Sequence, residues 1–303
     1  MLDSLFAQAN LLGEMLSFTF IQRALLVGLF VSLCAAILGV SLVLKRYAMI
    51  ATGLSHVGFA SMVITGALNI SPLVLTLPFA TLVIGAPANP LWVSVPVVLA
   101  AAFALLRIRQ DSRINGDSAV AIISTASLAI GIIVVSLTTG LNTDICDAMF
   151  GAIIAVTRAD MLMGIGLSVA VLLLFVLFYK QIFAVTFDED FSRATGVRVK
   201  LYTTILALLT AVTVVVGMRL VGAMLIASLT VFPALTAMRL FKRFLSVVIA
   251  SAVLSLLCFF FGMMVSLLWN LPPGASIVAV NLLAFLIFSI IGFFNKKRKK
   301  ELA

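Results

Sequence analysis

The chain has 303 residues, of which 63% are hydrophobic and 10% are charged, and its mean hydropathy is +1.28. Soluble domains carry about 25% charged residues, so the composition excludes a soluble globular protein. The formal net charge of +9 does not indicate nucleic-acid binding, because the basic residues flank long apolar runs. That placement is typical of membrane orientation and of contact with anionic lipids.

Seven runs contain no Lys, Arg, Asp or Glu, at residues 24–44, 47–106, 118–143, 161–179, 201–218, 220–238 and 244–295. A helix crosses a bilayer with about 20 apolar residues, so these runs are long enough to cross. They are continuous rather than alternating, which excludes a transmembrane β-barrel. We therefore predict an all-α, polytopic membrane helical bundle with about nine transmembrane helices, forming a single transmembrane domain over residues 1–303.

The first 19 residues lack the basic stretch that opens a cleavable signal peptide. We expect residues 1–19 to form an outer N-terminal segment that leads into the first crossing. The run 47–106 is predicted to cross twice, at about 48–68 and 90–108. The stretch between these crossings is too short and too broken for a further pair of spans, so we expect a re-entrant or outer-surface segment. Its prolines are Pro72, Pro78, Pro87 and Pro90.

The only histidine of the chain, His56, lies inside the predicted crossing at 48–68. Polar residues within membrane spans commonly mark an ion or substrate path. Helical spacing places Thr52 one turn earlier on the same face, with Ser55 and Phe59 nearby. Neutral imidazole is a good ligand for zinc, iron or manganese, so His56 is a candidate metal ligand with Thr52 beside it. The alternative is that His56 only forms a hydrogen bond between helices.

The predicted outer loop at 141–160 is half apolar and carries Asp144 and Asp147. Their carboxylate oxygens would supply further metal ligands if this loop folds back into the protein. The alternative is an ordinary solvated loop on the outer side.

The segment 185–200 is predicted to form a short helix parallel to the membrane. Its first turn would hold three acidic residues, which favour the positive end of the helix dipole: Asp188, Glu189 and Asp190. Spacings of four and three residues place three apolar side chains on one face: Phe187, Phe191 and Ala194. Gly196 is positioned to end the helix. Such a helix could dock a partner protein, whereas the alternative is a solvated loop.

The hairpin at 217–222 joins two crossings with almost no loop. We interpret Arg219, in this hairpin, as an anchor at the membrane interface. The second of the two crossings, 220–238, contains Gly222 and Pro233, which predicts that it is kinked or interrupted.

The distribution of basic residues predicts the orientation. If the loops after the odd-numbered crossings share one side, that side holds 17 of the 20 Lys and Arg residues, and the positive-inside rule makes it cytoplasmic. The N-terminus then lies outside, whereas the segment 185–200 and the basic tail at 295–303 lie in the cytoplasm. The last run, 244–295, crosses twice and turns at 269–274, where two prolines and a glycine end a helix.

The chain contains no phosphate-binding motif of the form GxxxxGK[ST] and no soluble stretch long enough to hold a nucleotidase. Its spans also lack a carboxylate relay of the kind that many proton-coupled carriers use. We therefore predict that the chain is not an enzyme and that a separate subunit supplies the energy for transport.

Five stretches that follow one another along nearly the whole chain carry a family resemblance. They are IQRALLVGLFVSLCAAILGVSLVLKRYAMIATGLSHVGFAS (21–61), INGDSAVAIISTASLAIGIIVVSL (114–137), MFGAIIAVTRAD (149–160), FDEDFSRATGV (187–197) and VGAMLIASLTVFPALTAM (221–238). In combination they resemble the permease subunit of the metal-cation ABC importers, which take up zinc, manganese or iron.

The resemblance implies a multi-pass protein of the bacterial cytoplasmic membrane that moves a divalent metal past His56 by alternating access. It implies cytoplasmic ATP-binding subunits that contact 187–197, an extracellular metal-binding protein, and a second permease copy or paralogue that completes a dimer. No permanently bound cofactor is expected. The family pattern before the histidine reads G-D-x-L-S-H, with an aspartate where this chain has Thr52. The resemblance therefore carries a metal ligand only at His56.

Two other functions stay open at this point. The first is an ABC permease for a chelated metal or another small solute, which the loss of a carboxylate at Thr52 favours. The second is a secondary carrier that works without an ATPase.

Overall fold

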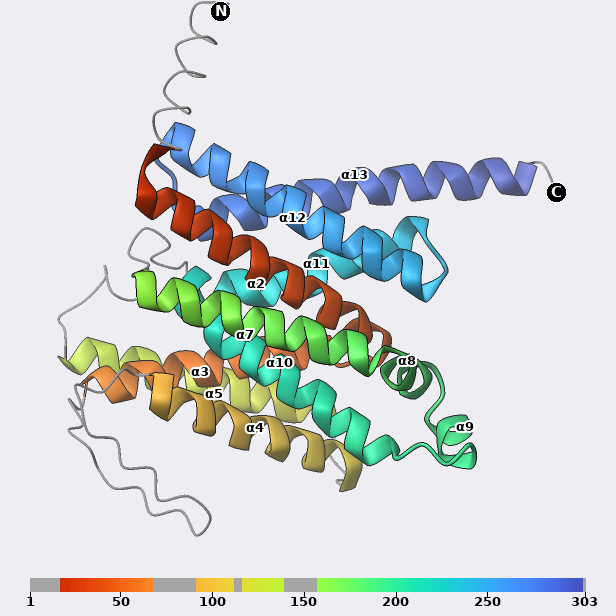
Figure 1. Ribbon diagram of the computed structural model, residues 1–303, viewed down its shortest axis with the longest axis horizontal. Coiled ribbons are helices and arrows are strands. Elements are labelled where there is room, and N and C mark those ends of the chain that lie inside the picture. The colour runs from red at the N-terminus through yellow and green to blue at the C-terminus, as the bar shows by residue number, and fades with distance from the viewer. Residues whose placement is uncertain (1–16, 68–90, 112–115, 139–156, 302–303) are drawn as a thin grey trace, which may run out of the picture.

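The computed structural model of the protein describes residues 17–67, 91–111, 116–138 and 157–301. Every regular element within these ranges is a helix, which confirms the predicted all-α class (Figure 1). The predicted segment between the second and third crossings lies outside the described residues, as do Asp144 and Asp147.

Within the described residues, nine long helices coincide with the nine predicted crossings. They are α2 (Thr19–Leu44), α3 (Ala48–Ala67), α4 (Leu91–Asp111), α5 (Gly116–Thr138), α7 (Arg158–Leu177), α10 (Val199–Val221), α11 (Ala223–Leu240), α12 (Phe244–Trp269) and α13 (Pro273–Glu301). Within the described residues, eight of them are long and apolar enough to span a membrane. The apolar part of the ninth, α4, is shorter and covers Ser94–Leu105. Two short helices, α8 (Tyr179–Phe187) and α9 (Glu189–Ala194), follow α7.

The long helices lie side by side, and α8 and α9 lie together at one end of the bundle, on the right of Figure 1. Helix α2 packs against α7, α10, α11 and α12, whereas α3 packs mainly against α4 and α5. Helix α10 contacts both α2 and α3 and so joins the two groups. Helix α13 packs on α11 and α12 and extends through the basic tail to Glu301.

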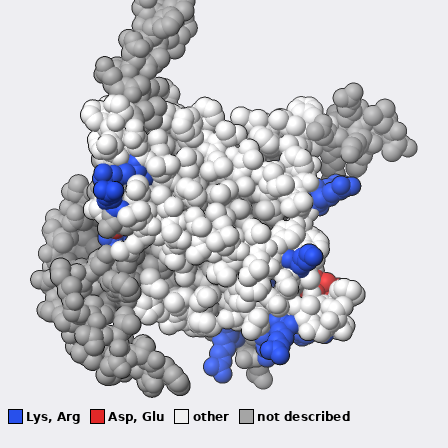
Figure 2. Space-filling view, in the orientation of Figure 1, with Lys and Arg blue, Asp and Glu red and all other residues white. Residues whose placement is uncertain are grey.

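A broad uncharged surface crosses the middle of the molecule (Figure 2). Basic side chains lie near the left edge of this view and at its right and lower right. This separation is what a helical bundle in a bilayer requires, because apolar side chains face lipid and charged ones face the two aqueous phases. Which of the two faces is cytoplasmic stays a prediction from the basic residues.

Helix α2 approaches its neighbours closely because small residues line its contacts. A Cβ atom on Gly39 would overlap the carbonyl oxygen of Thr230 on α11, and one on Gly28 would overlap the Phe259 ring on α12. The Ser255 hydroxyl of α12 also donates to the Ser32 carbonyl of α2 at 2.9 Å. Lipid and apolar side chains solvate a helix about equally well, so such close contacts and interhelical hydrogen bonds hold membrane helices together.

The connection between α10 and α11 is a single residue, Gly222, whose φ of +94° lies in the region that favours glycine. The tight hairpin is therefore confirmed, and α10 continues through Arg219 to Val221. Helix α11 is continuous and contains Pro233 in its interior. The predicted interruption lies at the start of this crossing rather than at Pro233.

Replacing Gly39 should separate α2 from α11. We expect Gly39→Leu to lower the stability of the protein by about 1–3 kcal/mol or more, because the side chain must displace backbone atoms of Thr230. Thermal unfolding of the detergent-solubilised protein measures this loss. Gly166→Ala is the matched control, because a Cβ atom there meets nothing within 4 Å. Equal unfolding temperatures for the two variants would contradict the close packing of α2.

Candidate functional site

His56 lies on α3 and is held by α5. Its Nδ1 atom is 2.6 Å from the Ser124 hydroxyl oxygen, and the ring is partly buried. Of the neighbours expected from helical spacing, Thr52 is partly buried, whereas Ser55 and Phe59 are buried. The Ser55 hydroxyl donates to the Thr52 carbonyl oxygen at 2.8 Å and is occupied within its own helix.

Sequence reasoning missed Ser124. It is one of several hydroxyl residues in the apolar run 118–143, and nothing local to it distinguishes it from the others. The contact arises because α3 and α5 pack closely: a Cβ on Gly53 would lie 2.8 Å from the Val120 side chain, and one on Gly131 would lie 2.7 Å from the Phe59 ring. The alternative prediction was a hydrogen bond between His56 and another helix. The contact with Ser124 of α5 is such a bond.

This hydrogen bond and metal binding are compatible. When Nδ1 carries the proton and donates to the Ser124 oxygen, Nε2 keeps a free lone pair for a metal. Within the described part of the chain, no group of three His, Cys, Asp or Glu side chains could hold a metal ion. Among these residue types, His56 thus stands as a lone candidate ligand within the described residues.

The predicted short helix exists as α9. Asp188 is its N-cap residue and accepts a hydrogen bond from the Phe191 amide at 2.9 Å, while Glu189 and Asp190 occupy the first turn. The helix ends at Ala194. The later Gly196 has a φ of +83°, a conformation that glycine adopts without strain. The cap at Asp188 and the acidic first turn, both readable from the sequence, account for where α9 begins.

The apolar face predicted for this helix needs a correction. Phe187 is the last residue of α8, and the Asp188 N-cap separates it from α9. Phe187 therefore does not share a helical face with Phe191 and Ala194. All three residues are nevertheless exposed, with Phe187 at 57% and Phe191 at 65%. Two apolar rings thus project from the end of the bundle that α8 and α9 form.

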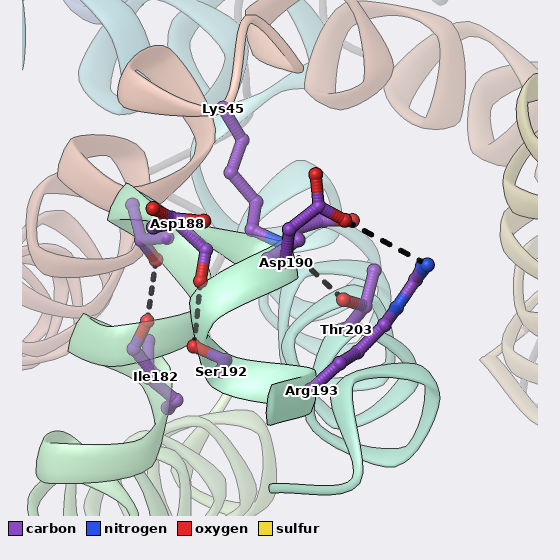
Figure 3. Close-up of polar contacts among 9 residues, drawn as sticks. Lys45, Ile182, Asp188, Asp190, Ser192, Arg193 and Thr203 are labelled. Atoms are coloured by element: carbon purple, nitrogen blue, oxygen red, sulfur yellow. Dashed lines mark hydrogen bonds and ion pairs between the residues drawn. The ribbon is translucent and has the colours of Figure 1, made fainter. Parts of the chain in front are cut away.

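A buried lysine connects α9 to the rest of the bundle (Figure 3). Lys45 Nζ lies 2.9 Å from Glu189 Oε1 and 3.1 Å from the Thr203 hydroxyl oxygen on α10. The Lys45 side chain is only 4% exposed, whereas that of Glu189 is 41% exposed. Burial lowers the pKa of Lys45, and the hydrogen bond and charge of Glu189 act in the opposite direction. In the sequence, Lys45 is one of the 17 basic residues that predict the orientation, and nothing local to it indicates its partner Glu189.

An aromatic cluster attaches α8 to the start of α12. The Phe183 ring lies 4.9 Å from that of Phe187 and 5.1 Å from that of Phe244, measured between ring centroids. Phe244 is buried at the first position of α12. The α8–α9 region therefore has an aromatic contact with α12 and an ionic contact with the end of α2.

Arg219 forms an ion pair that the sequence did not reveal. Its guanidinium lies 3.0 Å from Asp160 Oδ1, and Asp160 also caps α7 through reciprocal hydrogen bonds with Thr157. The pair lies beside a cavity of about 410 Å³, bounded by apolar residues of α4, α7 and α10 such as Met163 and Val216. Arg219 thus joins α10 to α7, in addition to its predicted place near the membrane interface.

The chain matches the ABC 3 transport family over residues 17–292. It is 28% identical to the manganese transport system membrane protein MntC of Halalkalibacterium halodurans, over 94% of this chain and 90% of that protein. It is 27% identical to the high-affinity zinc uptake system membrane protein ZnuB of Haemophilus influenzae, over 93% of this chain and 99% of that protein.

A solved structure has the same fold. The structure of PsaBC from Streptococcus pneumoniae in complex with Fab matches with a TM-score of 0.77 and 27% sequence identity. The match covers 92% of this chain and 94% of that one. The arrangement of the helices is therefore the one that this solved structure has.

Removing the N-cap of α9 should loosen that helix. We expect Asp188→Ala to cost about 1 kcal/mol of local stability and to speed amide exchange in α9 about five-fold. Hydrogen–deuterium exchange measures this effect. Asp190→Asn is the control, because its partner Arg193 is 3.9 Å away and both side chains are exposed. An exposed pair of this kind contributes little. The same exchange rate in both variants would argue against the cap.

Proposed function

Because the chain belongs to the ABC 3 transport family, we propose that it is the membrane permease of an ATP-driven importer that carries a divalent transition-metal cation, zinc, manganese or iron, into the cytoplasm. The observation that carries the proposal is the family match over residues 17–292, a range that includes His56 and its partner Ser124. The names of the manganese and zinc relatives support a metal as cargo.

His56 would be a ligand along the pathway. It places a neutral imidazole within an apolar span, so it can contact a dehydrating cation without a buried charge of its own. Ser124 limits the rotation of the ring and, by accepting from Nδ1, leaves Nε2 for the metal. Few ligands make a weak site, and weak coordination favours release of the cargo to the cytoplasm.

The other ligands and the energy would come from partners. A second permease copy or paralogue would face this one across a central pathway, and Asp144 and Asp147 are further candidate ligands. Cytoplasmic ATP-binding subunits would dock on the α8–α9 end, where Phe187, Phe191 and Ala194 are exposed beside acidic residues. An extracellular binding protein would deliver the cargo. ATP-driven changes in these contacts would alternate access to the pathway between the two sides of the membrane.

One observation favours a second cargo, a chelated metal or another small solute. Thr52 stands where the family resemblance led us to expect an aspartate, and a bare divalent cation gains more from a carboxylate than from a hydroxyl group. A carrier that works without an ATPase is disfavoured, because the chain belongs to a family of ABC permeases.

Loss of the imidazole should abolish most transport. We expect His56→Ala to lower Mn²⁺ or Zn²⁺ uptake at least about 10-fold, because losing even an outer-shell partner of a ligand costs that much. Uptake by cells that lack their own importer measures this loss, with the amount of folded protein determined in parallel. Thr125→Ala is the matched control, because its exposed hydroxyl donates to the Ala121 carbonyl of its own helix. Normal uptake by His56→Ala would exclude His56 as a ligand.

A carboxylate at residue 52 distinguishes the two cargoes. If the cargo is a bare cation, Thr52→Asp places an oxygen ligand one helical turn from His56 and should lower the KM for Mn²⁺ several-fold. The concentration dependence of initial uptake rates gives this KM. An unchanged or higher KM would favour the chelated metal or another solute.

A further inference from the structure

The ammonium group of Lys45 joins three helices at one point. It belongs to the residue that follows α2, and it contacts Glu189 of α9 and Thr203 of α10 (Figure 3). The side chain is almost fully buried. A buried ammonium that loses its partner is strongly unfavourable, so Lys45 and Glu189 should stay together when either of their helices moves. The neighbouring pair of Asp190 and Arg193 differs, because both of its side chains are exposed and the two charged groups are 3.9 Å apart.

Lys45 also lies in the short connection between α2 and α3. Backbone hydrogen bonds hold this connection tightly: the Lys45 amide donates to Ser41, the Arg46 amide to Val43 and the Tyr47 amide to Leu42. Helix α3 begins one residue later, at Ala48. Because this connection is short and hydrogen-bonded, a displacement of Lys45 should also displace the first turn of α3.

The same helix carries the candidate ligand. His56 lies eight residues after the start of α3, a distance of about 12 Å along the helix axis. A continuous helix is stiff over that length, so a shift at its first turn also moves His56. The path from α9 to His56 thus consists of one ion pair, one tight turn and two turns of helix.

We propose that Lys45 is a mechanical link that transmits the displacement of α9 to the α2–α3 turn and so to His56. The proposal rests on the proposed function, in which ATP-binding subunits move α9. An ion pair suits this role because it resists separation but tolerates small changes of angle. The aromatic cluster of Phe183, Phe187 and Phe244 connects the same region to α12 instead.

The test uses the complete importer, with its ATP-binding subunits and binding protein, in lipid vesicles. Metal ions imported per ATP hydrolysed are measured for Lys45→Met, Glu189→Gln and the double variant, with Mn²⁺ and Zn²⁺ in separate runs. We expect each single change to lower this ratio about five-fold or more while ATP hydrolysis persists. The ratio of the double variant should be no lower than that of the more impaired single variant, because both changes remove the same ion pair.

Lys242→Met is the matched control, because Lys242 is an exposed lysine in the connection between α11 and α12, outside the α8–α9 end. It should leave the ratio unchanged. Thr203→Val provides a second test if the single variants fail to assemble, since it removes one hydrogen bond of Lys45 and keeps the ion pair. We expect it to lower the ratio by a smaller factor than Lys45→Met does, because the ion pair with Glu189 remains.

Three results would overturn the link: an unchanged ratio in Lys45→Met and Glu189→Gln, multiplying effects in the double variant, or an unchanged ratio in Thr203→Val. A merely structural role would lower the amount of assembled importer but leave the ratio of the remainder normal. Metal uptake by the wild-type importer that does not need ATP would instead refute the proposed function. The two failures are therefore distinguishable.

Discussion

The close packing of α2 is the constraint on which the rest of the structure depends. Within a bilayer, apolar helices gain little by leaving lipid for one another, so contact depends on fit and on interhelical hydrogen bonds. Gly28 and Gly39 provide that fit against α12 and α11, and Ser32 accepts a hydrogen bond across the first of these contacts. With α2 fixed in this way, the positions of Lys45 at its end and of α3 after it are also fixed.

The two regions to which the proposed function assigns roles are placed by that arrangement. His56 and Ser124 meet inside the bundle, where α3 and α5 pack closely, whereas α9 lies at one end. Transport driven by a separate ATPase requires that these regions communicate. The turn between α2 and α3 contacts both regions. Its Lys45 binds Glu189 of α9, and the helix that follows the turn carries His56. Under the proposed function, this turn is a short physical route from the docking region of the ATP-binding subunits to His56.

The features predicted well from the sequence are local ones. Charged residues and helix-breaking residues bound the apolar runs, so the long helices lie where expected, and α9 is specified by its own cap at Asp188. One local inference was wrong, because spacing alone could not show that this cap separates Phe187 from α9. The interruption expected in the crossing 220–238 lies at Gly222, just before α11, since a single proline can remain inside a membrane helix.

The contacts that sequence reasoning missed are all distant along the chain. His56 and Ser124 are 68 residues apart, and Lys45 and Glu189 are 144 residues apart. Which hydroxyl or carboxylate meets which partner is decided by how the helices pack, and no periodicity within one helix reports that. Arg219 illustrates the same point, because its hairpin was recognised but its partner Asp160 on α7 was not.

The most direct test is a vesicle experiment with the wild-type permease, its ATP-binding subunits and its binding protein. An ATP-driven metal importer should accumulate Mn²⁺ or Zn²⁺ only when ATP and the ATP-binding subunits are both present. Accumulation at the same rate without either would contradict coupling to ATP. ATP hydrolysis that responds to the binding protein without any metal accumulation would contradict a divalent cation as the cargo.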